Sequence, residues 1–486
     1  MTEFENKTVA VIGLARSGLA CCDVLTKLGA RVIPYDGKPA DTLTGAIAHL
    51  STLGLTPLTG GAALNYGHLD YVITSPGVRK DAAVLQDAVA AGVPVLGEIE
   101  AAYRIARAPI LAITGTNGKT TTTMLLGEML QTAGIKTYIA GNIAAGDIAL
   151  PLIQAAFDAP PDAAIVAEIS SFQLEWISTF RPKVAALLNI SPDHGDRQTW
   201  EEYVAAKWRI FENQTEDDFA VVNWKLFSRS SISRFLEAKA KPKAFRPEVW
   251  FVSDEQDEHT ISDEGGLVYI AEYDDTFDAA NVKLLGKHNI ENIMAAAMMA
   301  RLFGVGIEPI REVATTFTGV VHRLEYVETI AGVKYVNNSM CTNADAFAKS
   351  LEALPEPKVV IAGGVFKGGD VATLADAVVK NNVKALVLMG RSAPQIEDAA
   401  RAAGYDAVYQ AGTLHEAVTL AASLALPGDT VLLAPACASF DMFADFEDRG
   451  DQFKAAVRGL GTPPARPSLP PLLGEGHKEQ DSKEQN

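Results

Sequence analysis

The stretch ITGTNGKTT at Ile113–Thr121 decides the fold of the middle of this chain. The apolar run 109–113 before it is typical of a buried strand, and residues 121–133 have the apolar spacing of a helix that stops at Gly134. A glycine-rich turn ending in Gly-Lys-Thr lies between them. Because backbone N–H groups at the start of a helix face an anion, this arrangement predicts a phosphate-binding loop.

The residue types in the loop suit a nucleoside triphosphate. Lys119 would reach the terminal phosphates, and the Thr120 hydroxyl would bind Mg²⁺. The usual pattern has a glycine where this chain has Ile113, so the match is to a shorter variant of the motif. The alternative, a turn with a chance lysine, is weaker because strand, loop and helix all fall where the motif needs them. The predicted nucleotide contacts in the loop are Gly115, Thr116, Asn117, Gly118, Lys119, Thr120 and Thr121.

Composition limits the class of protein. A length of 486 residues favours about three domains, and a net charge of −18 argues against a general nucleic-acid or membrane-surface role. The four cysteines form no CxxC pair, which favours a reducing compartment and indicates no zinc site. Neither a signal peptide nor an apolar run of about 18 residues is evident, so we expect a cytoplasmic protein without a membrane span.

The N-terminal part has the pattern of a Rossmann-like domain. A strand at 8–12 runs into a G-x-A-x-x-G turn at Gly13–Gly18, and a second strand at 31–35 is closed by Asp36. The missing central glycine makes NAD binding doubtful, and a uridine-nucleotide site is at least as good an interpretation. A third strand, 71–74, ends in Ser-Pro-Gly at 75–77, where open α/β sheets bind ligands; a purely structural turn is the alternative.

Two polar residues follow strands beside the loop. Glu168 ends a buried run at 163–167, and His194 comes after the run at 184–190. Since parallel strands gather their carboxyl ends at one sheet edge, these residues would meet Lys119 and Thr120 there and complete a Mg²⁺ site. Taken singly, Glu168 would be a helix cap and His194 a turn residue.

Lys207 lies within an apolar helix stripe. A capping box at 199–202 opens a helix to about residue 212, with Trp200, Tyr203, Ile210 and Phe211 on the stripe. A lysine there either extends its amine to solvent or is buried, and the spacing alone favours the solvent-directed form. Burial disfavours the ammonium form and would leave an amine able to take up CO₂ as a carbamate, an anion suited to a metal site.

The remaining chain contains a third α/β region. The acidic stretch 217–278 is expected at the edge of the central domain. Asn289 and Asn292 precede a helix at 293–302 and could read a base edge; for Asn289 the alternative is a helix cap. Arg323 lies in a predicted second linker at 321–325 and could reach a γ-phosphate or form a surface ion pair. Strands near 334–336, 359–362, 385–389 and 430–434 then carry polar loops at three of their ends, 337–343, 363–370 and 435–441. These loops could hold an anionic amino acid or serve only as glycine-rich turns. Residues 462–486 are expected to be disordered.

Eight ordered motifs between Ile113 and Gly450 resemble the Mur ligases. They are ITGTNGKTTTT, EISSFQLE, LNISPDH.DR, AAKWRIFEN, GKHNIEN, HRLE, GG..KGGD and APACASFD.F..F..RG. The resemblance is closest to the members that add D-glutamate to UDP-N-acetylmuramoyl-L-alanine in cytoplasmic peptidoglycan precursor synthesis. It implies an α/β fold of three domains: a Rossmann-like UDP-substrate domain at 1–107, a central P-loop ATP domain at 108–319 and a Rossmann-like amino-acid domain at 320–461.

The resemblance also implies chemistry and site residues. ATP would phosphorylate the substrate carboxylate, and the amine of the amino acid would attack the acyl phosphate, in a monomer that uses two Mg²⁺ ions. The residue matching Lys207 is carbamylated in this family, which reverses the preference for a solvent-directed lysine. Catalytic and metal roles pass to Lys119, Thr120, Glu168, His194 and Lys207, and ATP contacts to Asn289, Asn292, Arg323 and Asn338. Substrate contacts pass to Arg16, Ser17, Asp36, Lys38, Ser75, Gly77, Asn142, Ser170, His194, Thr342, Lys367, Ser439 and Phe446.

One loop departs from the family pattern. Where relatives usually read Asn-Asp-Ser-Lys-Ala-Thr-Asn, this chain has Asn338 in place of the Asp and Met340 in place of the Lys. Loss of that cation should weaken binding of an anionic amino acid by roughly 1–3 kcal/mol unless another group compensates. A different amino acid, a folate-type acceptor, a non-catalytic paralogue that binds cell-wall precursors, or an NAD-dependent oxidoreductase are the alternatives. The N-terminal Rossmann-like unit disfavours the folate branch.

Overall fold

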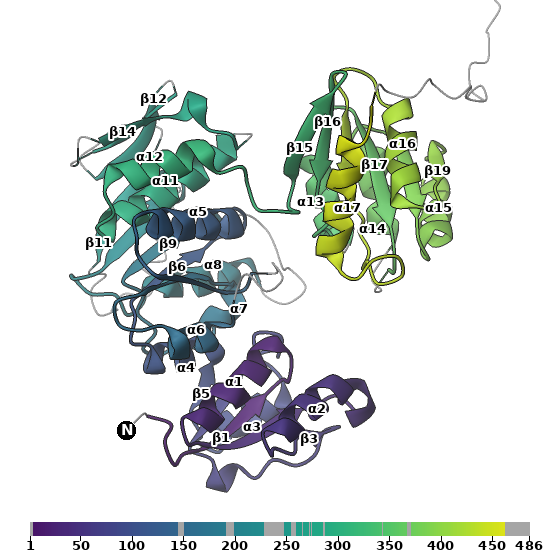
Figure 1. Ribbon diagram of the computed structural model, residues 1–486. Helices are drawn as coiled ribbons and strands as arrows, with labels where there is room; N and C mark the ends of the chain where they lie inside the picture. Colours follow the sequence, from purple (N-terminus) through teal and green to yellow (C-terminus); the bar gives the residue numbers. More distant parts are fainter. Residues whose placement is uncertain are drawn as a thin grey trace, which may run out of the picture. The chain divides into compact units, whose positions relative to one another are not determined.

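The computed structural model describes most of the chain as two compact units, Met1–Thr318 and Gly319–Asn486. The described residues are 3–143, 150–190, 199–227, 247–253, 259–264, 266–271, 273, 275–284, 287–342, 344–366 and 371–461. His194, Lys367 and the predicted disordered tail 462–486 lie outside them. In the described part the chain forms three sheets with helices between the strands, which confirms the predicted α/β class (Figure 1).

The first sheet has the strand order β3-β2-β1-β4-β5, and all its neighbouring strands are parallel. The strands are β1 Thr8–Ile12, β2 Arg31–Asp36, β3 Leu58–Thr59, β4 Tyr71–Thr74 and β5 Val95–Gly97, and the helices are α1 Arg16–Lys27, α2 Thr44–Thr52, α3 Ala83–Ala90 and α4 Glu98–Ile105. The three strands predicted here are confirmed to within one residue. Strand order reverses between β1 and β4, so the turns that follow these two strands lie together.

The second sheet has the order β14-β13-β12-β11-β10-β9-β6-β8-β7. Its strands are β6 Ile110–Thr114, β7 Thr137–Gly141, β8 Ala164–Glu168, β9 Val184–Leu187, β10 Phe219–Asn223, β11 Glu248–Ser253, β12 Thr260–Glu264, β13 Leu267–Ile270 and β14 Asp275–Asp278. Its helices are α5 Lys119–Thr132, α6 Leu152–Asp158, α7 Ser171–Leu174, α8 Trp200–Trp208, α9 Trp224–Phe227, α11 Lys287–Leu302 and α12 Ile307–Thr316. The stretch 217–278 supplies β10 to β14 at one side of the sheet, so it lies at an edge as predicted, although its strands were not predicted.

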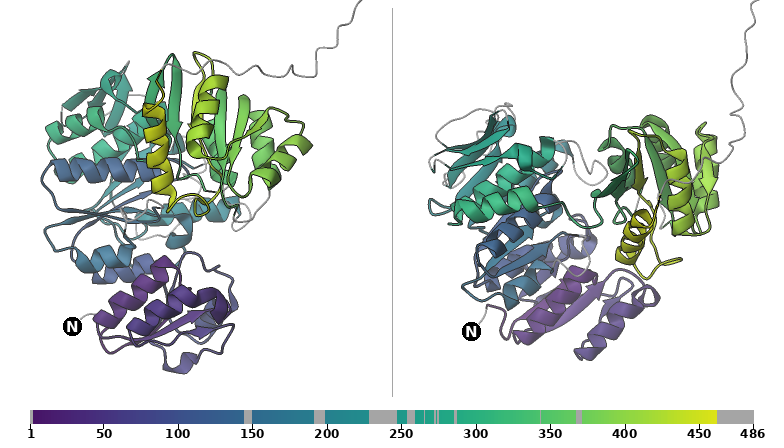
Figure 2. Two further views of the ribbon diagram at one scale, coloured as in Figure 1. Left: turned by 45° about the vertical axis from the view of Figure 1, so that its right-hand side comes forward. Right: turned by 45° about the horizontal axis from the view of Figure 1, so that its top comes forward.

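The second unit contains the third sheet, with the order β15-β16-β20-β17-β18-β19. Its strands are β15 Glu325–Ile330, β16 Val333–Asn337, β17 Lys358–Gly363, β18 Val383–Met389, β19 Val408–Gln410 and β20 Thr430–Leu433, and its helices are α13 Ala344–Glu352, α14 Val371–Lys380, α15 Ala393–Ala402, α16 Leu414–Leu424 and α17 Phe446–Arg458. Alternate residues of each strand enter two cores, one beneath α13, α14 and α15 and one beneath α16 and α17. The sheet is therefore covered on both faces, as Figures 1 and 2 show.

One hydrophobic core continues through both sheets of the first unit. It includes Val9 and Val11 of β1, Ile99 of α4, and Ile110 and Ala112 of β6. Helices α4 and α6 lie between the two sheets (Figure 1). The predicted domain boundary at residue 107 therefore stays a prediction, because the core does not end there. The change of unit between Thr318 and Gly319 lies beside the predicted linker.

Helix α4 carries two buried carboxylates with opposite behaviour. Burial of Glu100 opposes its charge, but hydrogen bonds from Ser178, Thr179 and Arg104 outweigh this effect and lower the pKa of Glu100 to about 2. For Glu98 the effect of burial prevails over a hydrogen bond from the backbone N of Ile153, and it raises the pKa to about 7. The charge of Glu100 thus stabilises the fold and the charge of Glu98 opposes it.

We expect Glu100→Gln to lower the apparent melting temperature at pH 7 by an amount that reflects roughly 2–3 kcal/mol. Because the folded pKa is depressed, this stabilisation is full above pH 4.5 and is lost as the pH falls towards 2. The gap between variant and wild type should therefore close in acid. Thermal denaturation of the full chain between pH 3 and pH 8 measures this dependence.

Glu98→Gln is the matched control. Its raised pKa makes wild-type stability fall as the pH rises from 4.5 through about 7, so the variant should gain on the wild type towards pH 8. Equal pH dependence of the two variants would contradict the assignment of opposite roles.

Candidate active site

The phosphate loop forms where the sequence predicts it. Strand β6 ends at Thr114 and helix α5 begins at Lys119, two residues earlier than expected. Gly118, which precedes the helix, has a φ of +83°, in the left-handed region. A Cβ atom on Gly118 would also overlap the side-chain oxygen of Asn292. The loop therefore requires glycine at this position for two independent reasons.

Two lysines meet the backbone of this loop. Lys119 Nζ donates to Gly115 O at 3.1 Å and to Thr116 O at 2.9 Å. Lys207 Nζ, from α8, donates to the same Gly115 O at 2.7 Å and lies 4.6 Å from the centre of the Tyr203 ring. Both ammonium groups thus share one carbonyl oxygen.

Lys207 is buried, with 2% of its surface exposed, so the solvent-directed lysine favoured by spacing alone is wrong. The capping box that starts α8 is confirmed, since Thr199 and Glu202 exchange both hydrogen bonds. Trp200 is 45% exposed, so its predicted place in the apolar stripe is wrong. The stripe begins one turn later, at Tyr203, and turns Lys207 towards the loop.

A hydroxyl and a carboxylate lie beside the lysines. Thr120 Oγ1 donates to Glu168 Oε2 at 2.7 Å, and both residues are 4% exposed. Glu168 is the last residue of β8, which pairs with β6 in parallel, so the two carboxyl ends coincide. The structure thus brings together Lys119, Thr120, Glu168 and Lys207. In the described part of the chain no three His, Cys, Asp or Glu side chains cluster as metal ligands, and His194 is outside that part.

Two residues of the site were missed. Asn189 accepts from Asn117 N at 2.8 Å and donates to Asn117 O at 3.0 Å, and its own carbonyl accepts from Thr116 N. Tyr203 OH lies 2.9 Å from Thr116 Oγ1. The sequence predicts a strand over 184–190 that includes Asn189, but the observed strand β9 ends at Leu187. The predicted apolar stripe of α8 likewise gives no sign of the role of the Tyr203 hydroxyl. A polar residue at the end of a strand was the available signal for Asn189.

The two predicted adenine-side asparagines lie within α11, which begins six residues earlier than predicted. Asn292 Nδ2 donates to Asn289 Oδ1 at 3.1 Å, and Asn292 is 5% exposed against Gly118. Asn289 is the third residue of the helix, so the cap interpretation is wrong. Base recognition by this pair stays a prediction, while Asn292 clearly supports the phosphate loop.

The predicted uridine-nucleotide residues gather around β1 and β4. Asp36 accepts from the backbone N of Leu14 at 2.9 Å and of Lys38 at 3.0 Å, and Ser75 Oγ donates to Gly13 O at 2.7 Å. Arg16 donates to Ile143 O at 3.2 Å. Asp36 and Ser75 therefore shape the turn itself. Ser17 is half-buried beside it, and Lys38 and Gly77 are exposed.

Two further predicted substrate residues lie at the end of β8. Asn142 is exposed, and its backbone N donates to Glu168 O at 2.9 Å. Asn142 therefore lies beside the Thr120–Glu168 pair. Ser170 is the N-cap of α7 and forms a capping box with Gln173. Ser170 thus has a structural task whether or not it also contacts substrate.

The three polar loops of the second unit meet because β16, β20 and β17 are neighbours and parallel. Of the predicted amino-acid contacts, Thr342 is half-buried, Ser439 is 2% exposed and Phe446 is the first residue of α17. Lys367, the fourth, is outside the described residues. Arg323 is exposed in this unit, and its contact with a γ-phosphate stays a prediction.

Asn338 is engaged within the protein at both ends of its amide. Its Oδ1 accepts from Leu324 N at 3.1 Å and its Nδ2 donates to Ser350 Oγ at 2.5 Å, with 5% of the residue exposed. Leu324 has a φ of +46° and His322 a φ of +63°. Asn338 therefore fixes a left-handed backbone segment, a structural task that the sequence did not indicate.

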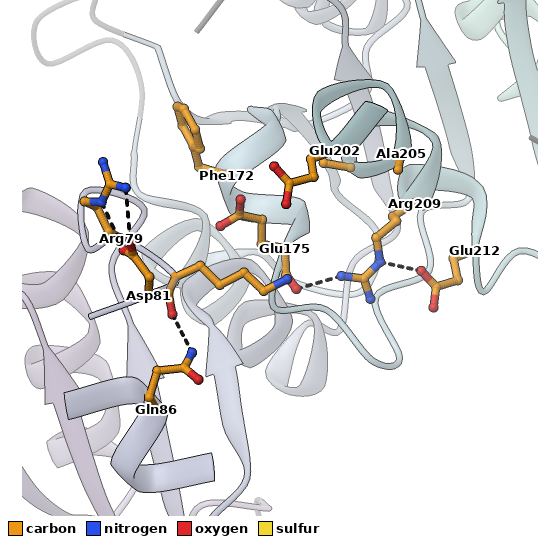
Figure 3. A pocket seen from close by; sticks show the side chains of 11 residues that line it. Arg79, Asp81, Gln86, Phe172, Glu175, Glu202, Ala205, Arg209 and Glu212 are labelled. Carbon is orange, nitrogen blue, oxygen red and sulfur yellow. Dashed lines mark hydrogen bonds and ion pairs between the residues drawn. The ribbon is translucent and has the colours of Figure 1, made fainter. Parts of the chain in front are cut away.

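A pocket of about 800 Å³ lies in the first unit between the loop before α3 and helices α7 and α8 (Figure 3). Its lining includes Arg79, Lys80, Phe172, Glu202 and Arg209, and among the described residues it includes none of the predicted site residues. Figure 3 shows Arg79 bound to Asp81 and Arg209 to Glu212. Helix α8 therefore presents Lys207 to the phosphate loop and other residues to this pocket.

Comparison with known proteins identifies the family. The family model of the Mur ligase middle domain matches residues 113–300, and that of the Mur ligase glutamate ligase domain matches residues 322–437. A UDP-N-acetylmuramoylalanine–D-glutamate ligase of a Thermoanaerobacter species is 43% identical over 465 residues, which cover 94% of this chain and 99% of that protein. The chain belongs to the Mur ligase family.

Other comparisons agree with this assignment. A ligase of the same name from Bacillus cereus is 40% identical over 464 residues, covering 95% of this chain and 99% of that protein. The crystal structure of UDP-N-acetylmuramate–alanine ligase from Thermotoga maritima has a TM-score of 0.50 at 18% identity and covers 94% of this chain and all of that one, which supports the Mur ligase fold. No helix in the described residues is long and apolar enough to span a membrane.

We expect Gly118→Ala to weaken nucleotide binding at least tenfold, because the left-handed backbone is strained by a side chain and the new methyl group meets Asn292. Isothermal titration with ATP measures the change. Gly134→Ala is the matched control: Gly134 also has a left-handed φ, +80°, but a Cβ there meets nothing within 4 Å. Equal affinities of the two variants would contradict the geometric argument.

Proposed function

We propose that this Mur ligase uses ATP to join D-glutamate to UDP-N-acetylmuramoyl-L-alanine in cytoplasmic peptidoglycan precursor synthesis. The observation that carries the proposal is 43% identity to a ligase of that name across 94% of this chain and 99% of the relative. The proposal is also supported by the way the structure brings the phosphate loop together with Thr120, Glu168 and Lys207. An inactive paralogue would have no need to keep this arrangement. In the proposed reaction the γ-phosphoryl group of ATP passes to the substrate carboxylate and ADP is released. The amine of the amino acid then attacks the acyl phosphate, and the amide forms as phosphate leaves.

The residues at the loop suit phosphoryl transfer between two anions. Such a reaction requires alignment and neutralisation of charge. Lys119 lies over the loop, and the neighbouring Thr120 hydroxyl and Glu168 carboxylate are the oxygen donors that Mg²⁺ prefers. We propose that these two, with His194 and a carbamylated Lys207, hold two Mg²⁺ ions, which would neutralise phosphate charge when bound.

Substrate contacts follow the sheet edges. The turns after β1 and β4 would take the uridine diphosphate through Arg16, Ser17, Asp36, Lys38, Ser75 and Gly77, with Asn142 and Ser170 nearer the reacting end. The second unit would supply Arg323 and Asn338 to ATP, and Thr342, Lys367, Ser439 and Phe446 to the amino acid. We propose a monomer divided into domains at 107 and 319.

Met340 favours a second candidate, the same chemistry with a different amino acid. The family pattern given by the resemblance has a lysine at this position, whereas the Met340 side chain offers no charge to an anionic amino acid. A non-catalytic precursor-binding paralogue is the remaining alternative.

The test is phosphate release with ATP, Mg²⁺ and UDP-N-acetylmuramoyl-L-alanine against a panel of D- and L-amino acids. Release with D-glutamate alone supports the proposal. Release with another amino acid would support the proposed reaction and would change the proposed amino-acid substrate. No release with any amino acid would contradict the ligase assignment.

Lys207→Ala should reduce kcat at least 100-fold, because the predicted carbamate and its bond to Gly115 O would both be lost. A short carboxylate added to the assay should restore part of the activity. ¹³C NMR after exposure to labelled bicarbonate should show a carbamate signal in the wild type that this variant lacks. Full activity of Lys207→Ala without added carboxylate would remove the carbamate hypothesis.

Met340→Lys should lower the KM for D-glutamate roughly tenfold, because it returns a cation to the predicted amino-acid loops. Met340→Leu is the uncharged control and should leave the KM unchanged. Steady-state kinetics at saturating ATP measures both. An unchanged KM in Met340→Lys would show that another group already supplies the missing charge.

A further inference from the structure

Arg449 is a fully buried cation in the second unit. It lies in the first turn of α17, with 0% of its surface exposed. Burial lowers the pKa of Arg449 to about 10, so the guanidinium keeps its charge at neutral pH. Among the described residues no carboxylate lies within ion-pair distance of it, although Asp441 is near enough to interact electrostatically.

Its hydrogen bonds go to two of the polar loops. Nε donates to Ser339 Oγ at 2.9 Å and Nη2 to Ser339 O at 2.8 Å, in the loop after β16. Nη1 donates to Cys437 O at 3.0 Å, in the loop after β20. Ser339 Oγ in turn donates to Phe446 O at 2.7 Å, at the start of α17.

These three segments carry three of the four predicted amino-acid contacts: Thr342, Ser439 and Phe446. We infer that Arg449 is a positioning residue of the amino-acid site, which holds the loops after β16 and β20 and the start of α17 in one arrangement. The inference rests on the proposed function for its substrate. A guanidinium suits the task because its planar fork directs several N–H groups at once, which a lysine cannot do.

The test compares Arg449→Lys with wild type in the phosphate-release assay, with UDP-N-acetylmuramoyl-L-alanine and D-glutamate. Lysine keeps the charge and loses the fork, so the KM for D-glutamate should rise roughly tenfold while the KM for ATP stays within about twofold. Ser339→Ala removes one hydrogen bond to Arg449 and the bond to Phe446 O, and should raise the same KM by a smaller factor. It carries the test if Arg449→Lys fails to fold.

Lys358→Met is the matched control. Lys358 is also buried, at 1% exposure, and donates to a backbone carbonyl, Asn381 O at 2.5 Å, but it begins β17 at the opposite end of the same sheet. This variant should lower the melting temperature and leave both KM values unchanged. A folded Arg449→Lys or Ser339→Ala with unchanged KM for D-glutamate, or with equal rises for both substrates, overturns the inference. Absence of wild-type activity with D-glutamate would instead refute the proposed function.

Discussion

The site in the first unit depends on one carbonyl oxygen that accepts hydrogen bonds from two lysines. Lys119 and Lys207 both donate to Gly115 O, at 3.1 and 2.7 Å. Two ammonium groups held this close repel each other, most strongly where protein excludes water. A bound phosphate between them, or conversion of Lys207 to an anionic carbamate, would relieve the repulsion. On electrostatic grounds this geometry therefore supports the proposals that the loop binds a phosphate and that Lys207 becomes a carbamate.

In the second unit, too, backbone carbonyl oxygens accept hydrogen bonds from a buried cation, here an arginine. Backbone carbonyls hold the Arg449 guanidinium, as they hold the lysines at the phosphate loop. Carbonyl dipoles satisfy the donors of a cation without cancelling its charge, so positive potential remains available to a substrate. Both sites also lie where neighbouring parallel strands end, at β8-β6-β9 and at β16-β20-β17. Sheet topology brings the residues of each site together, and each site contains a buried cation that would attract the anionic substrate we propose for it.

The sequence patterns predicted those parts of the site whose structure depends on interactions between residues close together in the chain. The strand, turn and helix of the phosphate loop follow from glycine conformation and apolar spacing, and they were predicted to within two residues. Burial of Lys207 was not predictable from spacing, because it depends on a carbonyl 92 residues away in the chain. The role of Asn189 and the internal hydrogen bonds of Asn338 likewise come from tertiary contacts. The family resemblance predicted a buried, modified Lys207, whereas the residue spacing alone favoured a lysine directed to solvent.

The two departures in the loop after β16 differ in kind. The Asn338 amide accepts from Leu324 N and donates to Ser350 Oγ, whose own hydrogen is directed to Ala346 O. A carboxylate cannot donate, so an aspartate in this conformation would face the Ser350 oxygen without a proton between them. Asparagine at 338 therefore belongs to the way this chain builds its left-handed segment at His322 and Leu324. Within the described part of the chain, the hydrogen bond found for Met340 is one from its backbone N to His322 O. Relative to the family pattern, methionine at this position removes a positive charge, and we relate that change to the proposed amino-acid specificity.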